Sequence, residues 1–175
     1  MTLDLQQSDG RFVTQATEAS THLHPHSYTL EGLLDYGRAY QDKKVLELVK
    51  KGIQWALNHQ LKDGGIFCFY AGQQFLPYVR VDVLAQTLRL AAIFSQYDSP
   101  FRSENQKKLE LLRQKLLTSQ VISGAQEGGF FYGQEENGLI HYHVNAWVTM
   151  FASQALWLYD DLQSNAPAYT FDFFV

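Results

Sequence analysis

The feature that most constrains this chain is an internal repeat of an acidic residue, one or two glycines and an aromatic side chain. It occurs three times, at residues 9–12, 63–67 and 127–131, and a glutamine stands just before each copy, at Gln6, Gln60 and Gln126. Helical periodicity fills the stretches between the copies, and the spacing suits two helices plus a variable link. The sequence therefore predicts repeated helical hairpins.

Five segments place apolar residues at spacings of three and four, as one face of a helix requires. They are residues 27–41, 43–60, 79–97, 104–119 and 143–160. The second and fourth are rich in lysine, whereas the last is apolar nearly all round. We therefore expect the first, third and fifth helices to form an inner ring, with the other two outside it. The long links with paired glycines and many aromatics are expected to be functional loops.

Length and composition exclude several classes of protein. A chain of 175 residues suits one domain. A net charge of −4 offers no basic surface for nucleic acid or an anionic membrane. The single cysteine, Cys68, excludes a disulfide framework. The N-terminus lacks the basic start and apolar run of a signal peptide, and no stretch reaches the roughly 18 to 20 apolar residues of a membrane span.

We accordingly expect a cytoplasmic protein of one domain. Its expected parts are a leading loop 1–26, hairpins 27–60 and 79–119, a last inner helix 143–160 and a tail 161–175.

The repeated Gln-x-x-Asp-Gly-x-aromatic elements between helical hairpins resemble the α/α toroids. That group includes six-hairpin glycosidases, sugar 2-epimerases of the N-acylglucosamine epimerase type, polysaccharide lyases and terpenoid cyclases. Residues 21–34 are similar to the histidine-containing, glutamate-ended inner helices of the sugar-processing members, and the aspartate-rich motif of a terpenoid cyclase is not present.

The resemblance implies an all-α fold, a partial α/α toroid of helical hairpin repeats with the long Gly/aromatic loops at one end. The chain holds fewer hairpins than a complete toroid. It would leave apolar inner-helix surface exposed, so we expect self-association or one part of a longer assembly.

In such a fold the N-termini of the inner helices share one end with the long loops, and helix N-termini favour anionic or hydroxyl-rich ligands. Five of the six histidines fall in the segments that lead into these helices. The candidate catalytic residues are His26, Glu31, Asp82, His141 and His143. The candidate substrate-binding residues are His24, Tyr28, Tyr70, Tyr78, Arg80, Tyr132, Asn145 and Trp147.

Each candidate has a structural alternative. Histidines titrate near neutral pH and suit proton transfer, but His24 and His26 could equally line the start of a helix. Arg80 could hold a substrate carboxylate or pair internally with Asp82. Glu31 suits a general acid if burial raises its pKa, yet the matching helical positions hold glutamines, Gln86 and Gln154, which favours a structural role equally.

The two His-x-His pairs, at residues 24–26 and 141–143, also raise the possibility of zinc. No carboxylate stands at ligand spacing beside either pair, so we expect no metal and no cofactor.

The expected function is acid–base chemistry on a sugar or uronate, with epimerase or isomerase, glycosidase and lyase left open. The alternative is a non-catalytic helical scaffold or fragment that binds glycan or a partner chain. The expected partners are a small carbohydrate and a second copy of the chain, with neither nucleic acid nor membrane.

Overall fold

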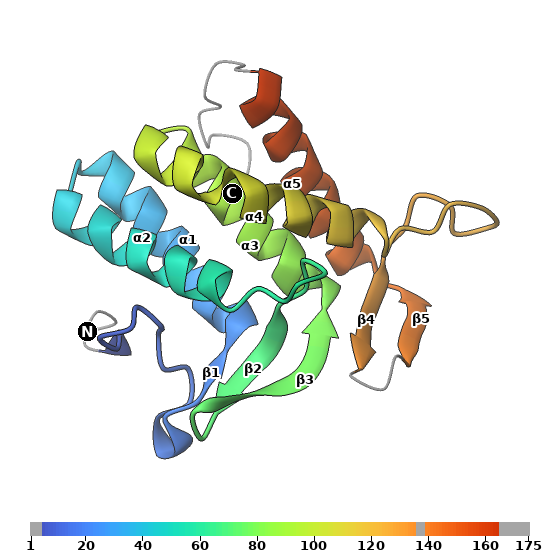
Figure 1. The fold of residues 1–175 in the computed structure, drawn as a ribbon, viewed down its shortest axis with the longest axis horizontal. Coiled ribbons are helices and arrows are strands. Elements are labelled where there is room, and N and C mark those ends of the chain that lie inside the picture. The colour runs from blue at the N-terminus through green and yellow to red at the C-terminus, as the bar shows by residue number, and fades with distance from the viewer. Residues whose placement is uncertain (1–4, 136–138, 165–175) are drawn as a thin grey trace.

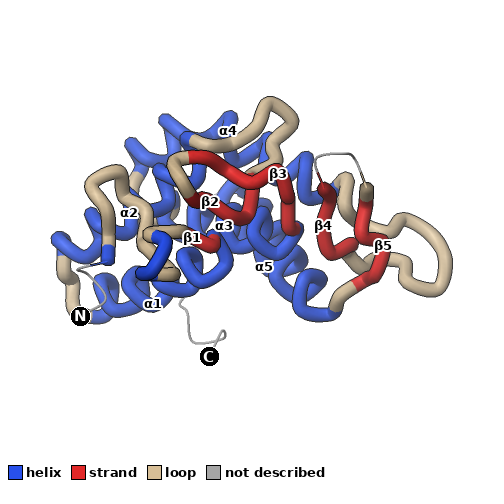
Figure 2. The backbone as a smooth tube through the Cα atoms, turned by 90° about the horizontal axis from the view of Figure 1, so that it is seen from below, coloured by secondary structure: helices blue, strands red, loops and turns tan. Residues whose placement is uncertain are grey.

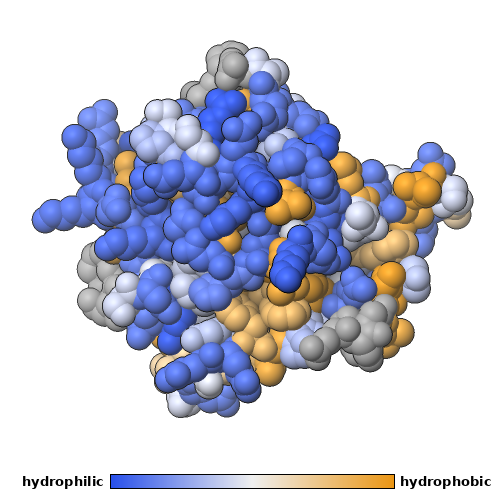
Figure 3. Space-filling view, in the orientation of Figure 1, coloured by the Kyte–Doolittle hydropathy of each residue, from blue (hydrophilic) through white to orange (hydrophobic). Residues whose placement is uncertain are grey.

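The computed structural model describes residues 5–135 and 139–164, and within them the helices form two layers. The helices are α1 (Leu23–Ala39), α2 (Lys43–Asn58), α3 (Val81–Ser95), α4 (Ser99–Leu117) and α5 (Ala146–Ser164). Every residue of α3 is buried, and α3 contacts the other four helices. Figure 1 shows α2 and α4 in front of α1, α3 and α5. Their outward face is largely hydrophilic (Figure 3), as the lysine-rich segments predict.

The outer helices begin at aspartate caps. The Asp42 carboxylate accepts the first backbone N–H groups of α2, and Asp98 accepts the N–H of Phe101 in α4. Asp98 also binds the Lys50 ammonium group at 2.8 Å, which ties α4 to α2. Pro100 lies in the first turn of α4, where a proline costs no hydrogen bond, so this helix begins five residues before the predicted start.

The expectation of an all-α partial toroid is wrong, because the glycine- and aromatic-rich links form a sheet. Five antiparallel strands lie in the order β1-β2-β3-β4-β5. They are β1 (Thr21–His22), β2 (Phe67–Ala71), β3 (Gln74–Arg80), β4 (Phe131–Glu135) and β5 (Ile140–Val144). Aromatic residues fit a pleated surface well. Gly72 and Gln73 both have positive φ, so they form the tight turn between β2 and β3.

The sheet crosses one end of the helices, as the view from below shows (Figure 2). β1 leads directly into α1 and β3 directly into α3, while Asn145 alone separates β5 from α5. The N-termini of the three inner helices therefore lie at the sheet. The expected tail begins inside α5, and residues 165–175 lie outside the described part of the chain.

The glutamine of the first two copies of the repeat ties a glycine turn to an outer helix. In the first copy the Gln6 amide donates to the Gly10 carbonyl at 2.9 Å and to the Leu48 carbonyl of α2 at 2.8 Å. The second copy makes the same two bonds, from Gln60 to Gly64 and to Lys108 of α4. The repeat is thus a device that fastens the strands to the outer layer.

The glycines of these two turns are required by the backbone. Gly10 has φ +102° and Gly64 has φ +92°. A Cβ at Gly10 would collide with the Lys51 carbonyl, and one at Gly64 with the Leu111 carbonyl. Only glycine allows this conformation and this close approach to α2 and α4.

Candidate functional site

Three inner helices present matching positions at the sheet end of the molecule. The second, sixth and ninth residues of a helix lie on one face. In α1 they are His24, Tyr28 and Glu31, in α3 Asp82, Gln86 and Arg89, and in α5 Trp147, Phe151 and Gln154. The contacts below show that these positions meet in successive levels, starting from the sheet.

The first level is built around the buried carboxylate of Asp82, which is 1% exposed. The Arg80 guanidinium binds it through two nitrogens, with Nε at 3.0 Å from Oδ1. His24 Nδ1 lies 3.0 Å from Oδ2, and the His24 side chain is 25% exposed. Burial raises the pKa of Asp82, but His24 and Arg80 outweigh it and hold that pKa below its usual value. Asp82 therefore stays ionised against His24.

The sheet extends this level through a row of rings. The Arg80 guanidinium carbon lies 5.1 Å from the centroid of the Tyr132 ring. Tyr132 in turn stacks on His143, with centroids 4.9 Å apart. His141 contacts Tyr78 edge-on at 5.8 Å. Tyr132 on β4 thus contacts both Arg80 on β3 and His143 on β5.

Aromatic side chains of α1 and α5 flank this cluster, and two of them, Tyr28 and Phe151, belong to the second level together with Gln86 of α3. The Tyr28 ring contacts His24 edge-on at 4.9 Å and lies 6.1 Å from Phe151. Trp147 contacts Phe151 at 5.5 Å. Tyr28 is 40% exposed and Trp147 52% exposed, so both present ring surface to solvent beside the buried polar groups.

The third level is a second arginine–carboxylate pair. Both terminal nitrogens of Arg89 bind the two oxygens of Glu31. The Arg89 side chain is 4% exposed, and its guanidinium carbon lies 5.8 Å from the Phe151 ring centroid. Arg89 therefore occupies both oxygens of Glu31, as the structural alternative for Glu31 expects.

His26 lies outside this cluster, on the side of α1 that faces α2. It is 1% exposed, and both ring nitrogens are engaged, since Nδ1 accepts the Phe12 N–H at 3.2 Å and Nε2 donates to the Gly52 carbonyl at 3.3 Å. Burial lowers the pKa of His26 to about 4. It packs edge-on against Trp55. These contacts describe a core residue.

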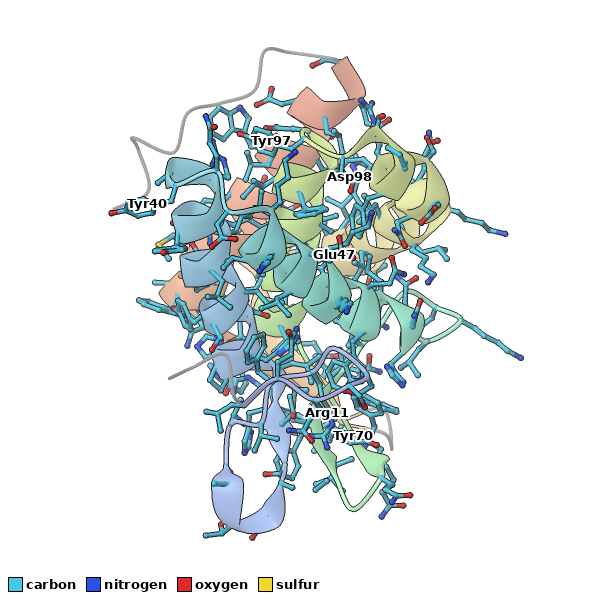
Figure 4. The ribbon with its side chains drawn as sticks, turned by 90° about the vertical axis from the view of Figure 1, so that its left-hand side faces the viewer. Arg11, Tyr40, Glu47, Tyr70, Tyr97 and Asp98 are labelled. Carbon is cyan, nitrogen blue, oxygen red and sulfur yellow. The ribbon has the colours of Figure 1, made fainter. Side chains whose placement is uncertain are left out.

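Two further candidates also have other surroundings. The Asn145 side chain accepts the N–H groups of Trp147 and Val148, so it caps α5. Tyr70 lies under the Arg11 guanidinium at 5.1 Å, and Figure 4 shows the two side by side near the first strands. Tyr70 also contacts Phe75 of β3 and Trp55 of α2.

Sequence reasoning missed Arg89 and Phe151. It matched Glu31 with Gln86, a separation of 55 residues, whereas the structure places Glu31 level with Arg89, 58 residues away. The separation of 58 also relates His24 to Asp82. The ends of β1 and β3 set this register, and those strands were not predicted.

A pocket of about 210 Å³ lies between strands β3, β4 and β5 and the C-terminal end of α4. Its lining includes Val79, Lys115 and Phe131 and none of the predicted site residues. Within the described ranges, no three His, Cys, Asp or Glu side chains are grouped so that they could hold a metal ion. None of the described helices is both long enough and apolar enough to cross a membrane.

No protein-family model and no curated protein matches the sequence. Two solved structures share its fold. An α-amylase from Clostridium perfringens matches with a TM-score of 0.65 and 12% identity, over 91% of this chain and 48% of that one. A D-mannose isomerase matches with a TM-score of 0.69 and 16% identity, over 94% of this chain and 44% of that one. The chain thus spans less than half of the length of either structure.

Proposed function

We propose that the cluster at the sheet ends of α1, α3 and α5 binds a sugar and transfers a proton on it, as a sugar isomerase or epimerase does. The observation that carries this proposal is His24 Nδ1 lying 3.0 Å from the buried Asp82 carboxylate. The negative charge of Asp82 beside Nδ1 favours the tautomer with its proton on that nitrogen, which leaves the lone pair of the other nitrogen available as a base. Because the ring is 25% exposed, a ligand can reach it.

The Arg80 guanidinium has a positioning role in this proposal. It binds Asp82 through two nitrogens and so fixes the carboxylate against His24. Isomerisation also needs a group that returns the proton. His143 is the second histidine of the cluster, reached through Arg80 and Tyr132, and we assign it that role. Trp147 and Tyr28 supply exposed ring surface on which the apolar face of a sugar can stack.

The pairing of the carboxylates argues against glycosidic hydrolysis. A glycosidase needs two carboxyl groups across the scissile bond, one of them protonated. Here Asp82 is bound by Arg80 and Glu31 by Arg89, each through two nitrogens. Arg80 and His24 hold the pKa of Asp82 below its usual value, so Asp82 is a poor general acid, and both oxygens of Glu31 are engaged by Arg89. The fold is shared with both a D-mannose isomerase and an α-amylase, so that likeness supports a carbohydrate substrate, and the choice of reaction rests on the carboxylate pairing.

Solvent deuterium exchange tests the proposal directly. The protein is incubated with a panel of aldoses and ketoses in D2O, and NMR follows deuterium at the carbon next to the carbonyl. We expect exchange with at least one sugar, and a loss of roughly a hundredfold in His24→Gln. The matched control is His59→Gln, because His59 contacts Trp55 and Phe75 away from the cluster. Exchange at the wild-type rate in His24→Gln would refute the assignment.

The exposed rings also favour a second function, the binding of glycan without turnover. Tyr28 and Trp147 would then act as a stacking platform alone. This alternative predicts that sugars raise the unfolding temperature while no deuterium is incorporated, and that Trp147→Ala removes the thermal shift.

A further inference from the structure

The side chain of Gln86 is buried without a hydrogen-bond partner. Gln86 is 1% exposed, and neither its amide nitrogen nor its amide oxygen is bonded within the described residues. A buried amide left unpaired costs about 1–3 kcal/mol. The buried amide of Asn105, by contrast, donates to Gln54 and to the Phe101 carbonyl. Gln86 therefore has two donors and an acceptor that nothing described here uses.

Gln86 occupies the second level of the site, between the two arginine–carboxylate pairs. It shares one face of α3 with Asp82, one turn before it, and Arg89, one turn after it. At the same level α1 places Tyr28 and α5 places Phe151, whose rings are 6.1 Å apart. The positions of α1 and α5 that match Gln86 are thus aromatic.

The charges around Gln86 are already balanced. Arg80 is bound by Asp82, and Arg89 is bound by Glu31. A carboxylate on a ligand needs a cation that is not committed to another carboxylate. Both arginines of this site are already bound to carboxylates of the protein. Neither is therefore available to neutralise the carboxylate of a charged sugar, which would approach Asp82 and Glu31 with its negative charge unpaired.

We propose that Gln86 is the specificity-determining residue of the site and that its amide binds neighbouring hydroxyl groups of a neutral sugar. The inference rests on the proposed function and names its substrate class. An amide offers donor and acceptor side by side, which matches two adjacent hydroxyls. Tyr28 is the 40% exposed member of the flanking pair, so its ring offers the surface on which the bound sugar stacks. The site therefore rejects uronates, because no arginine is available for their carboxylate.

The test uses sugars that differ only at C6. Titration calorimetry measures binding of D-glucose against D-glucuronate and of D-mannose against D-mannuronate to the wild-type protein. We expect a neutral hexose to bind more tightly than its uronate. Gln86→Met, which keeps the length of the side chain but removes its hydrogen bonds, should weaken hexose binding by roughly tenfold or more.

A stability control separates a ligand role from a structural one. Gln54 is hydrogen-bonded to Asn105 and Asn58, so Gln54→Met should lower the unfolding temperature. Gln86→Met should not lower it, because no bond within the described residues is lost.

Three results would overturn the inference. They are unchanged hexose affinity in Gln86→Met, a uronate that binds wild type more tightly than its hexose, and destabilisation of Gln86→Met equal to that of Gln54→Met. The second needs no variant. If the wild-type protein binds none of the four sugars and exchanges no deuterium on any other, the proposed function fails and this inference with it. If deuterium exchange succeeds while Gln86→Met binds normally, only the inference fails.

Discussion

Replacing His26 by glutamine should change how the stability of the protein depends on pH. His26 is neutral in the fold because burial lowers its pKa from 6.5 to about 4. The unfolded chain takes up a proton as the pH falls through 6.5, whereas the folded chain resists until about 4. The stability that His26 contributes is therefore complete above pH 6.5 and is lost as the pH falls towards 4. Integrated from pH 7 to pH 5, the loss is about 2 kcal/mol.

Urea unfolding of both proteins at these two pH values measures the effect. Glutamine keeps one donor for the Gly52 carbonyl and one acceptor for the Phe12 N–H, so His26→Gln is expected to fold. Every other titrating group is common to the two chains, so the difference between them isolates His26. Wild type should lose about 2 kcal/mol more than His26→Gln over this interval. Equal losses would show that His26 is not buried in its neutral form, and the exclusion of His26 from the site would fall with it.

Two further predictions concern the glycine turn at Gly64 and the Arg89–Glu31 ion pair. In a urea titration, Gly64→Ala should lower the free energy of unfolding by about 2 kcal/mol or more, because Gly64 has φ +92° and a Cβ would collide with the Leu111 carbonyl. The control is Gly32→Ala in α1, where a Cβ meets no other atom, and it should raise that free energy by up to about 1 kcal/mol. In a double-mutant cycle, Glu31→Gln and Arg89→Met should show a coupling energy above about 1 kcal/mol, and additive effects would mean that the pair contributes nothing.

The helices could be predicted from the sequence because they carry a strong periodic signal. All five are present near their expected places, and the lysine-rich pair lies outside. The strands carry no such signal. Residues 67–71 and 131–135 are short and interrupted by a bulge in their pairing, so the alternation of polar and apolar residues is broken. The paired glycines at residues 64–65 and 128–129, just before these strands, lie in turns and made the whole stretches resemble loops.

The sequence did not show which residues of neighbouring helices lie level with one another at the site, because the strands decide that. Asp82, Arg80, His24 and Tyr132 were named from the sequence and are in contact in the structure. Arg89 was not named, because matching one helix to the next by similar residues placed the register three positions off. Helical periodicity fixes which face a residue occupies but not its height along the axis. Height is set by where each helix begins, and here the end of a strand decides that.

The sheet fixes the relative positions of the site residues through its strand pairing, which loops would not do. Antiparallel pairing places Arg80 opposite Gly133 and Gly133 opposite His141. Side chains alternate between the two faces of a strand, so a slip of one residue in β4 would turn Tyr132 away from Arg80 and His143. Gly133 permits this register, because a Cβ there would lie 2.6 Å from the Val79 carbonyl. The pairing that contradicts an all-α fold thus brings Tyr132 into contact with both Arg80 and His143 beside the His24–Asp82 pair, and the proton transfer by two histidines that we propose depends on that arrangement.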